Sequence, residues 1–316
     1  MPHSHHSHSG QFCKHAAGTL EDVVREAIRQ GFEVYGLTEH VPRYRSADLY
    51  PEEEGLTPEQ LLGLFDDFVA EAHRLKKKYA DQILLLVGLE TEHITSGDLD
   101  HLDALLSRYR GKIQYLVGSV HHVNELPIDF DRATFEKAVA NAGPGDDRAR
   151  TEAFLCAYFD LQYAVLTRFQ PEIVGHVDLC RLYTPELRFA DYPQARARLE
   201  RNIAFAVGYG ALFELNAAAL RKGWPGAYPG ADVVELVQAA GGRFALSDDS
   251  HGPHAVGLNY ARLREYGQRV QVRALAVLAE SEMPNAAGRY VCARDVPGRW
   301  WEHPFWSNCA QHQKHA

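Results

Sequence analysis

Strand-like and helix-like segments alternate along the whole chain, and this alternation restricts the possible folds more than any other feature. Thr19 with Asp22, and Thr57 with Gln60, form capping boxes that predict helix starts. Helical patterns also cover 154–169, 192–210 and 231–242, with a last helix expected near 269–280 and the longest loop at 141–151. The strand-like runs between them are 32–40, 83–93, 113–123, 172–179, 211–216 and 243–251. Regular alternation of this kind predicts an α/β barrel or a doubly wound parallel sheet.

Composition narrows the class of protein. The 316 residues include no apolar run near the roughly 20 residues that a membrane span needs, and no linker or repeat, so we expect one domain over residues 1–316. The polar, histidine-rich start does not resemble a secretory signal, and five cysteines without CxxC pairing favour a reducing, cytoplasmic location. The net charge of −9 argues against nucleic acid as a partner.

Polar residues of the kinds that bind metals stand at the ends of six strand-like runs. They are His40, Glu90, His121, His176, Asn216 after Glu214, and Asp249 with His251. In a parallel barrel, all carboxyl ends of the strands meet at one mouth, whereas an open sheet spreads them along an edge. The barrel is therefore the favoured fold.

The opening "HHSHSG" could be an unstructured tail, a tag, or the first strand of a site. His6 and His8 are two residues apart and would project from the same face of a strand. His15 follows after a short turn, whereas His3 and His5 have no comparable support and could belong to a tail.

Each of these strand-end residues, taken alone, is weak evidence for a metal site. Glu90 and Glu92 share one strand face, His121 and His122 lie on opposite faces so that one of them is expected to point outward, and Asp249 and His251 form a D-x-H pair. Alternatives for single residues are a surface position or a hydrogen-bonded core histidine. Buried acids and imidazoles are costly unless they are paired or coordinated, so their joint occurrence predicts two or three divalent ions, with Zn, Fe and Mn as candidates.

Several motifs resemble the PHP (polymerase and histidinol phosphatase) superfamily, and more closely its fungal-type histidinol-phosphatases. The motifs are "HSHHSHSG", "LTEHVPR", "GLETEH", "GSVHHVNELPIDFD", "VGHVDL", "ELNAAALRKG" and "LSDDSHG". The similarity extends over nearly the whole chain, because "YPEEEGL", "KYADQ" and "HPFW" also fit.

The resemblance implies a distorted (β/α)7 TIM-like barrel with three divalent metal ions. Matched by position, the first ion would be held by His6, His8, Glu90 and Asp249. Glu90 would bridge to a second ion held with His121 and His176, and the third would be held by His15, His40 and His251. Many superfamily members have Asp or Glu at the position of His15, so this chain departs from them there.

The activity implied is hydrolysis of L-histidinol phosphate by a metal-activated hydroxide. Arg181 and Arg221 would bind the phosphate, and Asp249 would position the hydroxide or handle the leaving-group proton. Glu92 and Glu39 are candidates for the ammonium and imidazole of the substrate. The alternatives are a PHP-type phosphoesterase acting on nucleotides or another small phosphomonoester, and a metal-storage or metal-sensing protein. The oligomeric state is not predicted.

Overall fold

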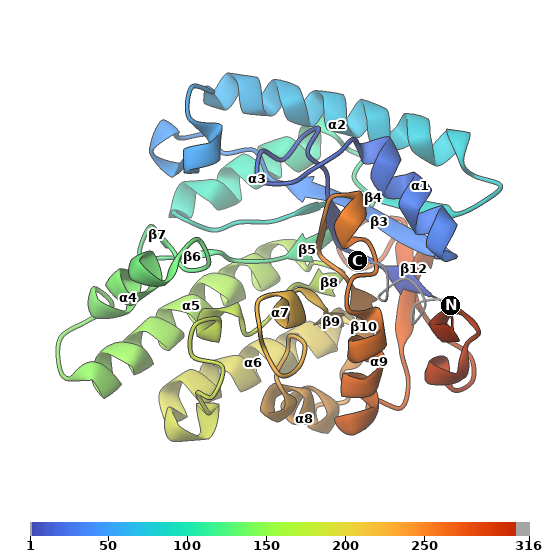
Figure 1. Ribbon diagram of the computed structural model, residues 1–316. Coiled ribbons are helices and arrows are strands. Elements are labelled where there is room, and N and C mark those ends of the chain that lie inside the picture. Colours follow the sequence, from blue (N-terminus) through green and yellow to red (C-terminus); the bar gives the residue numbers. More distant parts are fainter. Residues whose placement is uncertain (1, 308–316) are drawn as a thin grey trace.

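The computed structural model describes residues 2–307 and is built around a seven-stranded parallel sheet (Figure 1). The sheet order is β1-β3-β4-β5-β8-β9-β10. These strands are β1 (His3–Ser4), β3 (Val34–His40), β4 (Leu84–Glu90), β5 (Tyr115–Gly118), β8 (Ile173–Val174), β9 (Leu212–Asn216) and β10 (Arg243–Ser247). Every pairing in this sheet is parallel, so all seven carboxyl ends lie at one mouth.

The two edges of the sheet meet and nearly close a barrel. Short strands continue both edges: β2 (Ser7–His8) follows β1, and β11 (Ser250–His251) follows β10. β11 pairs in parallel with β2, and His251 lies opposite His8. The predicted distorted (β/α)7 barrel is therefore confirmed, and its seam brings two histidines from opposite ends of the chain together.

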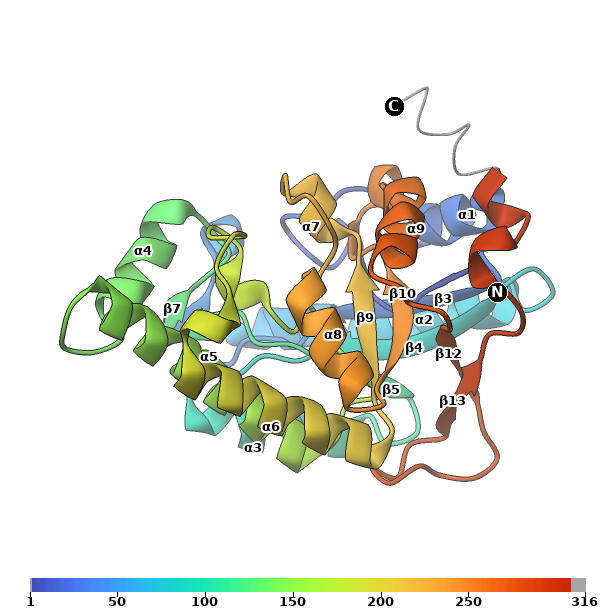
Figure 2. The same cartoon turned by 90° about the horizontal axis from the view of Figure 1, so that it is seen from below.

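The helices lie outside the strands, with α1 and α2 on one side and α5, α6 and α8 on the opposite side (Figures 1 and 2). They are α1 (Leu20–Gln30), α2 (Pro58–Lys78), α3 (Ser96–Arg108), α4 (Arg132–Ala140), α5 (Asp147–Phe169), α6 (Pro193–Tyr209), α7 (Ala218–Arg221), α8 (Ala231–Ala239) and α9 (Tyr260–Arg269). Both predicted capping boxes, at Thr19 and at Thr57, are present. None of the helices within residues 2–307 is both long and apolar enough to cross a bilayer.

Two predicted segments differ from the structure. The helix expected near 269–280 is wrong, because β12 (Ala276–Glu280) pairs antiparallel with β13 (Val291–Asp295) beside β10. Pairing with the next strand along the chain overrides the helical propensity of an alanine- and leucine-rich segment. The expected loop at 141–151 is shorter, because α5 begins at Asp147, where the side chain of Asp146 accepts a hydrogen bond from the Ala149 amide. The remaining hairpin joins β6 (His122–Val123) to β7 (Leu126–Pro127).

One continuous set of buried apolar side chains extends from Leu20 to Trp306. A single core of this extent supports the prediction of one domain, which stays a prediction. The aromatic residues near the end of the described chain pack against this core, as the sequence suggested, since Trp300, Phe305 and Trp306 are buried.

His3 and His5, for which the sequence left a tail as one alternative, are fully buried in the barrel. The Leu246 amide donates to Nε2 of His3 at 2.9 Å, and the Leu278 amide donates to Nε2 of His5 at 3.0 Å. Each imidazole therefore satisfies a backbone N–H of a neighbouring strand. This role requires an unprotonated Nε2.

We expect His5 to make stability depend on pH. Burial, with His3 adding to it, holds the pKa of His5 well below its usual value. The unfolded chain binds a proton near pH 6.5 that the folded chain does not, so the free energy of unfolding should fall by about 1.4 kcal/mol per pH unit below that value for this one group. Urea unfolding of chelator-treated protein from pH 7.5 to 5 should show a shallower slope for His5→Leu than for the wild type.

A matched control is Val277→Ala, which removes a buried side chain of β12 and no titratable group. This variant should be less stable than the wild type at every pH and keep the wild-type slope. Equal slopes for His5→Leu and the wild type would contradict the proposed protonation link.

Candidate metal centre

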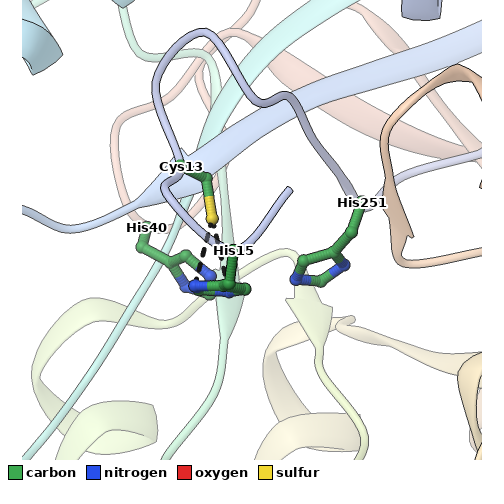
Figure 3. A group of neighbouring side chains, drawn as sticks. All are labelled: Cys13, His15, His40 and His251. Atoms are coloured by element: carbon green, nitrogen blue, oxygen red, sulfur yellow. Dashed lines mark hydrogen bonds between the residues drawn. The ribbon is translucent and has the colours of Figure 1, made fainter. Parts of the chain in front are cut away.

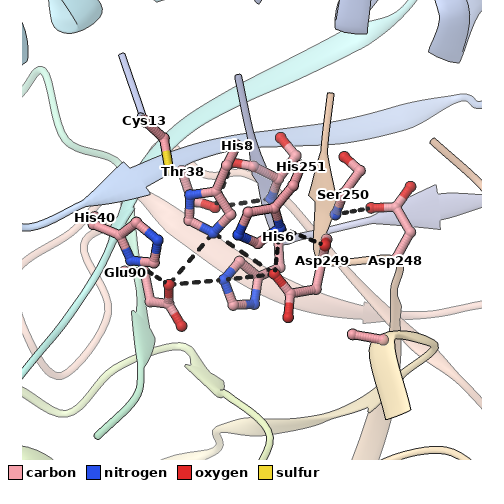
Figure 4. A network of polar contacts seen from close by, with 12 residues as sticks. His6, His8, Cys13, Thr38, His40, Glu90, Asp248, Asp249, Ser250 and His251 are labelled. Carbon is pink, nitrogen blue, oxygen red and sulfur yellow. Dashed lines mark hydrogen bonds and ion pairs between the residues drawn. The ribbon is translucent and has the colours of Figure 1, made fainter. Parts of the chain in front are cut away.

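The predicted ligands gather at the carboxyl ends of the strands around one carboxylate, that of Glu90 at the end of β4 (Figure 4). Its Oε2 lies 3.2 Å from Nε2 of His6, 3.4 Å from Nε2 of His8 and 2.9 Å from Nδ1 of His40. Its Oε1 lies 3.1 Å from Nε2 of His121 and 3.0 Å from Nε2 of His176. Five imidazoles from four segments of the chain therefore surround one buried carboxylate.

Asp249 lies on the opposite side of His6 and His8 from Glu90. Its Oδ1 is 3.7 Å from Nε2 of both histidines and 3.7 Å from Nδ1 of His251. The backbone of Asp249 has a φ of 46°, in the left-handed region that non-glycine residues seldom adopt. Strain of this kind is typical of functional sites, where the surrounding structure holds one side chain in a required direction.

The ligand atoms group as metal sites require. Atoms of His6, His8 and Glu90 lie within 4.8 Å of one another, and so do atoms of Glu90, His121 and His176. A third group joins His6, His176 and Glu214. Two more groups meet the same limit and place His251 in both. They are His8, Asp249 and His251, and Cys13, His15, His40 and His251.

The donor atoms fit bound cations. Among the described residues, Nε2 of His6, His8 and His40 and Oε2 of Glu90 are buried atoms without a hydrogen-bond partner. Buried polar atoms left in this state are costly, and a divalent cation among them would satisfy all of them together. Imidazole and carboxylate donors suit Zn, Fe and Mn.

Protonation in the metal-free chain follows from burial and from the neighbours. Burial disfavours ionisation of Glu90, but His6, His121 and His40 outweigh it and hold the pKa of Glu90 well below its usual value. Burial, reinforced by His8, holds the pKa of His40 and of His251 well below the usual value. Glu90 is thus a carboxylate and these two histidines are neutral imidazoles, which are the forms that bind metals.

His15 also fits the role of a neutral ligand. Burial and the neighbouring His8 lower its pKa to about 4. Its ring lies 5.4 Å from that of His40 and 5.0 Å from that of His251, measured between ring centroids. The structure therefore brings together all nine residues predicted as ligands.

Three carboxylates contact the ligand histidines on the ring nitrogen remote from the cluster. Glu214 lies 3.2 Å from Nδ1 of His6, Glu39 lies 3.5 Å from Nδ1 of His8, and Glu92 lies 3.0 Å from Nδ1 of His121. A carboxylate at Nδ1 fixes the ring orientation and the tautomer, so that Nε2 faces the metal.

This placement corrects two predictions. Glu39 and Glu92 were expected to meet the substrate, but neither lines the cavity at the mouth. One of His121 and His122 was expected to point outward, but both are buried, and Nδ1 of His122 lies 3.0 Å from Glu92. Glu214 had no predicted role. Its position two residues before Asn216, on the same face of β9, was the available signal.

A cavity of about 500 Å³ opens above the cluster. Of the predicted residues, His15, His40, Glu90, His121, His176, Arg221, Asp249 and His251 line it. The sequence analysis had not identified the other polar or aromatic residues of the lining. These are Tyr50, Glu52, Asp129, Phe130, Lys222, Tyr228 and His254.

Arg181 does not line this cavity, contrary to its predicted position at the mouth. Its Nη2 donates to Asp178 at 2.7 Å and to Asp232 at 2.7 Å, and its guanidinium lies 4.7 Å from the ring centroid of Phe189. The side chain is buried because the chain turns directly after His176 into a short 3₁₀ helix, Leu179–Arg181. Its contacts with Asp178, Asp232 and Phe189 stabilise the fold.

Fold and site together define a parallel α/β barrel with a histidine- and carboxylate-rich metal-type centre at one mouth. The chain belongs to the PHP domain family, whose model matches residues 4–218. It is 44% identical over 303 residues to the "Probable histidinol-phosphatase" of Schizosaccharomyces pombe, covering 95% of this chain and 96% of that protein. It is 31% identical to the histidinol-phosphatase of Saccharomyces cerevisiae, covering 97% and 99% of the two chains.

Solved structures agree on the fold. The hisK protein of Listeria monocytogenes has a TM-score of 0.68 at 21% identity, covering 82% of this chain and 99% of its own. Histidinol phosphate phosphatase of Lactococcus lactis, crystallised with zinc, L-histidinol and phosphate, has a TM-score of 0.60 at 18% identity, covering 87% and 96%. At these sequence identities, the structural similarity supports the assignment of the barrel fold.

Replacing Glu214 with glutamine should weaken metal binding. The change removes the negative charge that holds Nδ1 of His6, and loss of such a partner typically costs about 10- to 100-fold in metal affinity. Competition with a chelator measures the effect, and circular dichroism checks the fold. Glu235→Gln, on the exposed surface of α8, is the control and should bind metal as the wild type does. Equal metal retention by both variants would remove Glu214 from this role.

Proposed function

We propose that this chain is a metal-dependent phosphomonoesterase of histidine biosynthesis that hydrolyses L-histidinol phosphate to L-histidinol and inorganic phosphate. The observation that carries the proposal is the 44% identity, over nearly the full length of both chains, to a relative that bears this name. The cavity over the ligand cluster supports it, because a small phosphomonoester fits a volume of about 500 Å³. The proposal includes a cytoplasmic location, one domain, and no nucleic-acid partner.

We propose three divalent ions, with zinc, iron or manganese as candidates. His6, His8, Glu90 and Asp249 would hold the first, Glu90 with His121 and His176 the second, and His15, His40 and His251 the third. Such ions acidify a bound water and neutralise phosphoryl oxygens.

Arg221 is the arginine proposed for the phosphate. It lies at the cavity mouth, and its Nη1 and Nη2 each lie 3.4 Å from the backbone carbonyl oxygen of Asp249. These long contacts leave donors of the guanidinium available to phosphoryl oxygens, which a planar fork binds well. Lys222, in the same lining, adds positive charge.

Asp249 is proposed to orient the attacking water or to transfer the proton that the leaving alkoxide needs. Its carboxylate contacts ligand histidines and lines the cavity, and Nδ2 of Asn216 donates to its Oδ2 at 3.4 Å. His6 and His251 outweigh the effect of burial and hold the pKa of Asp249 well below its usual value, so the group is a carboxylate in the metal-free chain.

The cationic end of the substrate would meet Asp129 and Glu52. Both acids line the cavity, whereas Glu39 and Glu92 do not. Phe130 and Tyr50 stand beside them with nearly parallel rings, 6.3 Å apart between centroids, and offer aromatic surface to an imidazole. An acidic and aromatic lining favours an amine-bearing phosphomonoester over a nucleotide, which carries more negative charge.

Replacing Asp129 with asparagine should discriminate between substrates. Losing a charged hydrogen bond should raise KM for histidinol phosphate by roughly 10-fold or more, whereas p-nitrophenyl phosphate, which has no ammonium, should change by less than about threefold. Phosphate release from both compounds, and from several nucleoside monophosphates, measures the effect. Glu136→Gln, on the exposed face of α4, is the control.

Comparable turnover of histidinol phosphate and the nucleotides by the wild type would defeat the proposed substrate. It would favour the alternative of a PHP-type phosphoesterase acting on nucleotides or another small phosphomonoester.

Replacing Arg221 with alanine should lower kcat/KM by an order of magnitude or more for every phosphomonoester, because the phosphate group is common to all. Arg221→Lys should recover part of the loss through charge alone. Arg196→Ala, in the exposed part of α6, is the control. Wild-type kinetics in Arg221→Ala would show that this arginine does not contact the substrate.

A further inference from the structure

The loop between β2 and α1 carries a cysteine, Cys13, into the third group of ligands (Figure 3). The Cys13 amide donates to the carbonyl of Ser9 at 2.8 Å, and the Ala17 amide donates to the carbonyl of His251 at 3.0 Å. The first part of the loop is thus held by a hydrogen bond within the loop, and its last part by a hydrogen bond to β11. Cys13 and His15 are held against His251 by backbone contacts that do not depend on their own side chains.

The sulfur of Cys13 points at the imidazoles, as Figure 3 shows. Its Sγ lies 3.3 Å from Nε2 and 3.5 Å from Nδ1 of His15, and the side chain is only 6% exposed. One ligand atom from each of Cys13, His15, His40 and His251 lies within 4.8 Å of the others.

These spacings suit a four-coordinate ion. With Zn–N bonds near 2.0–2.1 Å and a Zn–S bond near 2.3 Å, neighbouring ligand atoms of a tetrahedral site stand roughly 3.3 to 3.8 Å apart. The contact between Cys13 and His15 already has this length, and small side-chain rotations would bring the remaining atoms into range. Nε2 of His40, a buried atom without a hydrogen-bond partner, is free to complete the set.

We propose that the thiolate of Cys13 is a fourth protein ligand of the third divalent ion, beside His15, His40 and His251. The inference rests on the third ion of the proposed function and extends its ligand set. When the ion binds, the thiol proton leaves to solvent and a sulfur–metal bond forms, with no change of oxidation state.

Two charged groups lie near Cys13. The guanidinium of the buried Arg43 lines the same small pocket and is paired with Glu53 at 3.2 Å, while Oε1 of Glu39 accepts hydrogen bonds from Ser9. Burial and the charge of Glu39 raise the pKa of the Cys13 thiol and Arg43 lowers it, so the thiolate would form together with a bound cation.

The ligand set distinguishes the third ion from the other two. One thiolate and three imidazoles match the closed, four-ligand pattern of zinc sites, whereas the second ion would have three protein ligands, Glu90, His121 and His176, and an open position for water or substrate. A soft sulfur ligand also favours zinc over manganese or magnesium. The ligand set of the third ion is therefore the one that favours zinc over other divalent metals.

Cobalt provides a direct test, because a thiolate bound to Co²⁺ gives a near-ultraviolet charge-transfer absorption that imidazole and carboxylate do not. The full chain, stripped of metal and reconstituted with Co²⁺, should show this band, and Cys13→Ser should lose it while still binding cobalt. Cys156→Ser, at a partly buried cysteine of α5 outside the described ligand groups, is the matched control and should keep the band. A wild type without the band, or a Cys13→Ser variant that retains it, would overturn the inference.

Zinc retention is the second readout. Against a chelator, Cys13→Ser and Cys13→Ala should each release one zinc ion per chain at a chelator concentration at least about 10-fold lower than the wild type requires, with the remaining zinc held as before. The alanine variant covers the case in which serine disturbs folding. Unchanged release would make the contact between Cys13 and His15 an ordinary hydrogen bond. Histidinol phosphate turnover is measured separately, so loss of the proposed substrate with the cobalt band intact would defeat the function and leave this ligand standing.

Discussion

The buried carboxylate of Glu90 is the point on which the site depends. It is only 1% exposed and contacts five imidazoles that come from four segments of the chain. A lone carboxylate in this position would be strongly destabilised, and so would buried imidazoles without their partners. The arrangement is stable only as a set, which is why it is built at the mouth of a barrel, where parallel strands end side by side.

The barrel supports this set from two directions. Below it, His3 and His5 accept backbone hydrogen bonds and close the interior without using a metal. Around it, Glu39, Glu92 and Glu214 hold the outer nitrogens of three ligand histidines. The histidine-rich opening of the chain therefore serves two purposes: His3 and His5 complete the fold, whereas His6 and His8, with backing carboxylates, contribute to the centre.

Much of the site could be predicted because its signal is local. A strand that ends in a histidine or an acid is visible in the sequence, and so is the two-residue spacing that places His6 and His8 on one face. Resemblance to a known superfamily added the grouping of these residues. The direction of a long side chain is not local, however. Arg181 follows a strand end as Arg221 does, but the chain turns it back onto Asp178, and only Arg221 reaches the cavity.

We could predict from the sequence alone the alternation of strands and helices, the capping boxes at Thr19 and Thr57, and the residue types that end each strand, because these depend on neighbours a few positions away. The closed barrel, in contrast, sets which polar groups contact each other. It turned Glu92 toward His121 and away from the cavity, and it made a strand of Ala276–Glu280. These outcomes depend on partners tens to hundreds of residues away, whose positions are fixed only when the barrel closes.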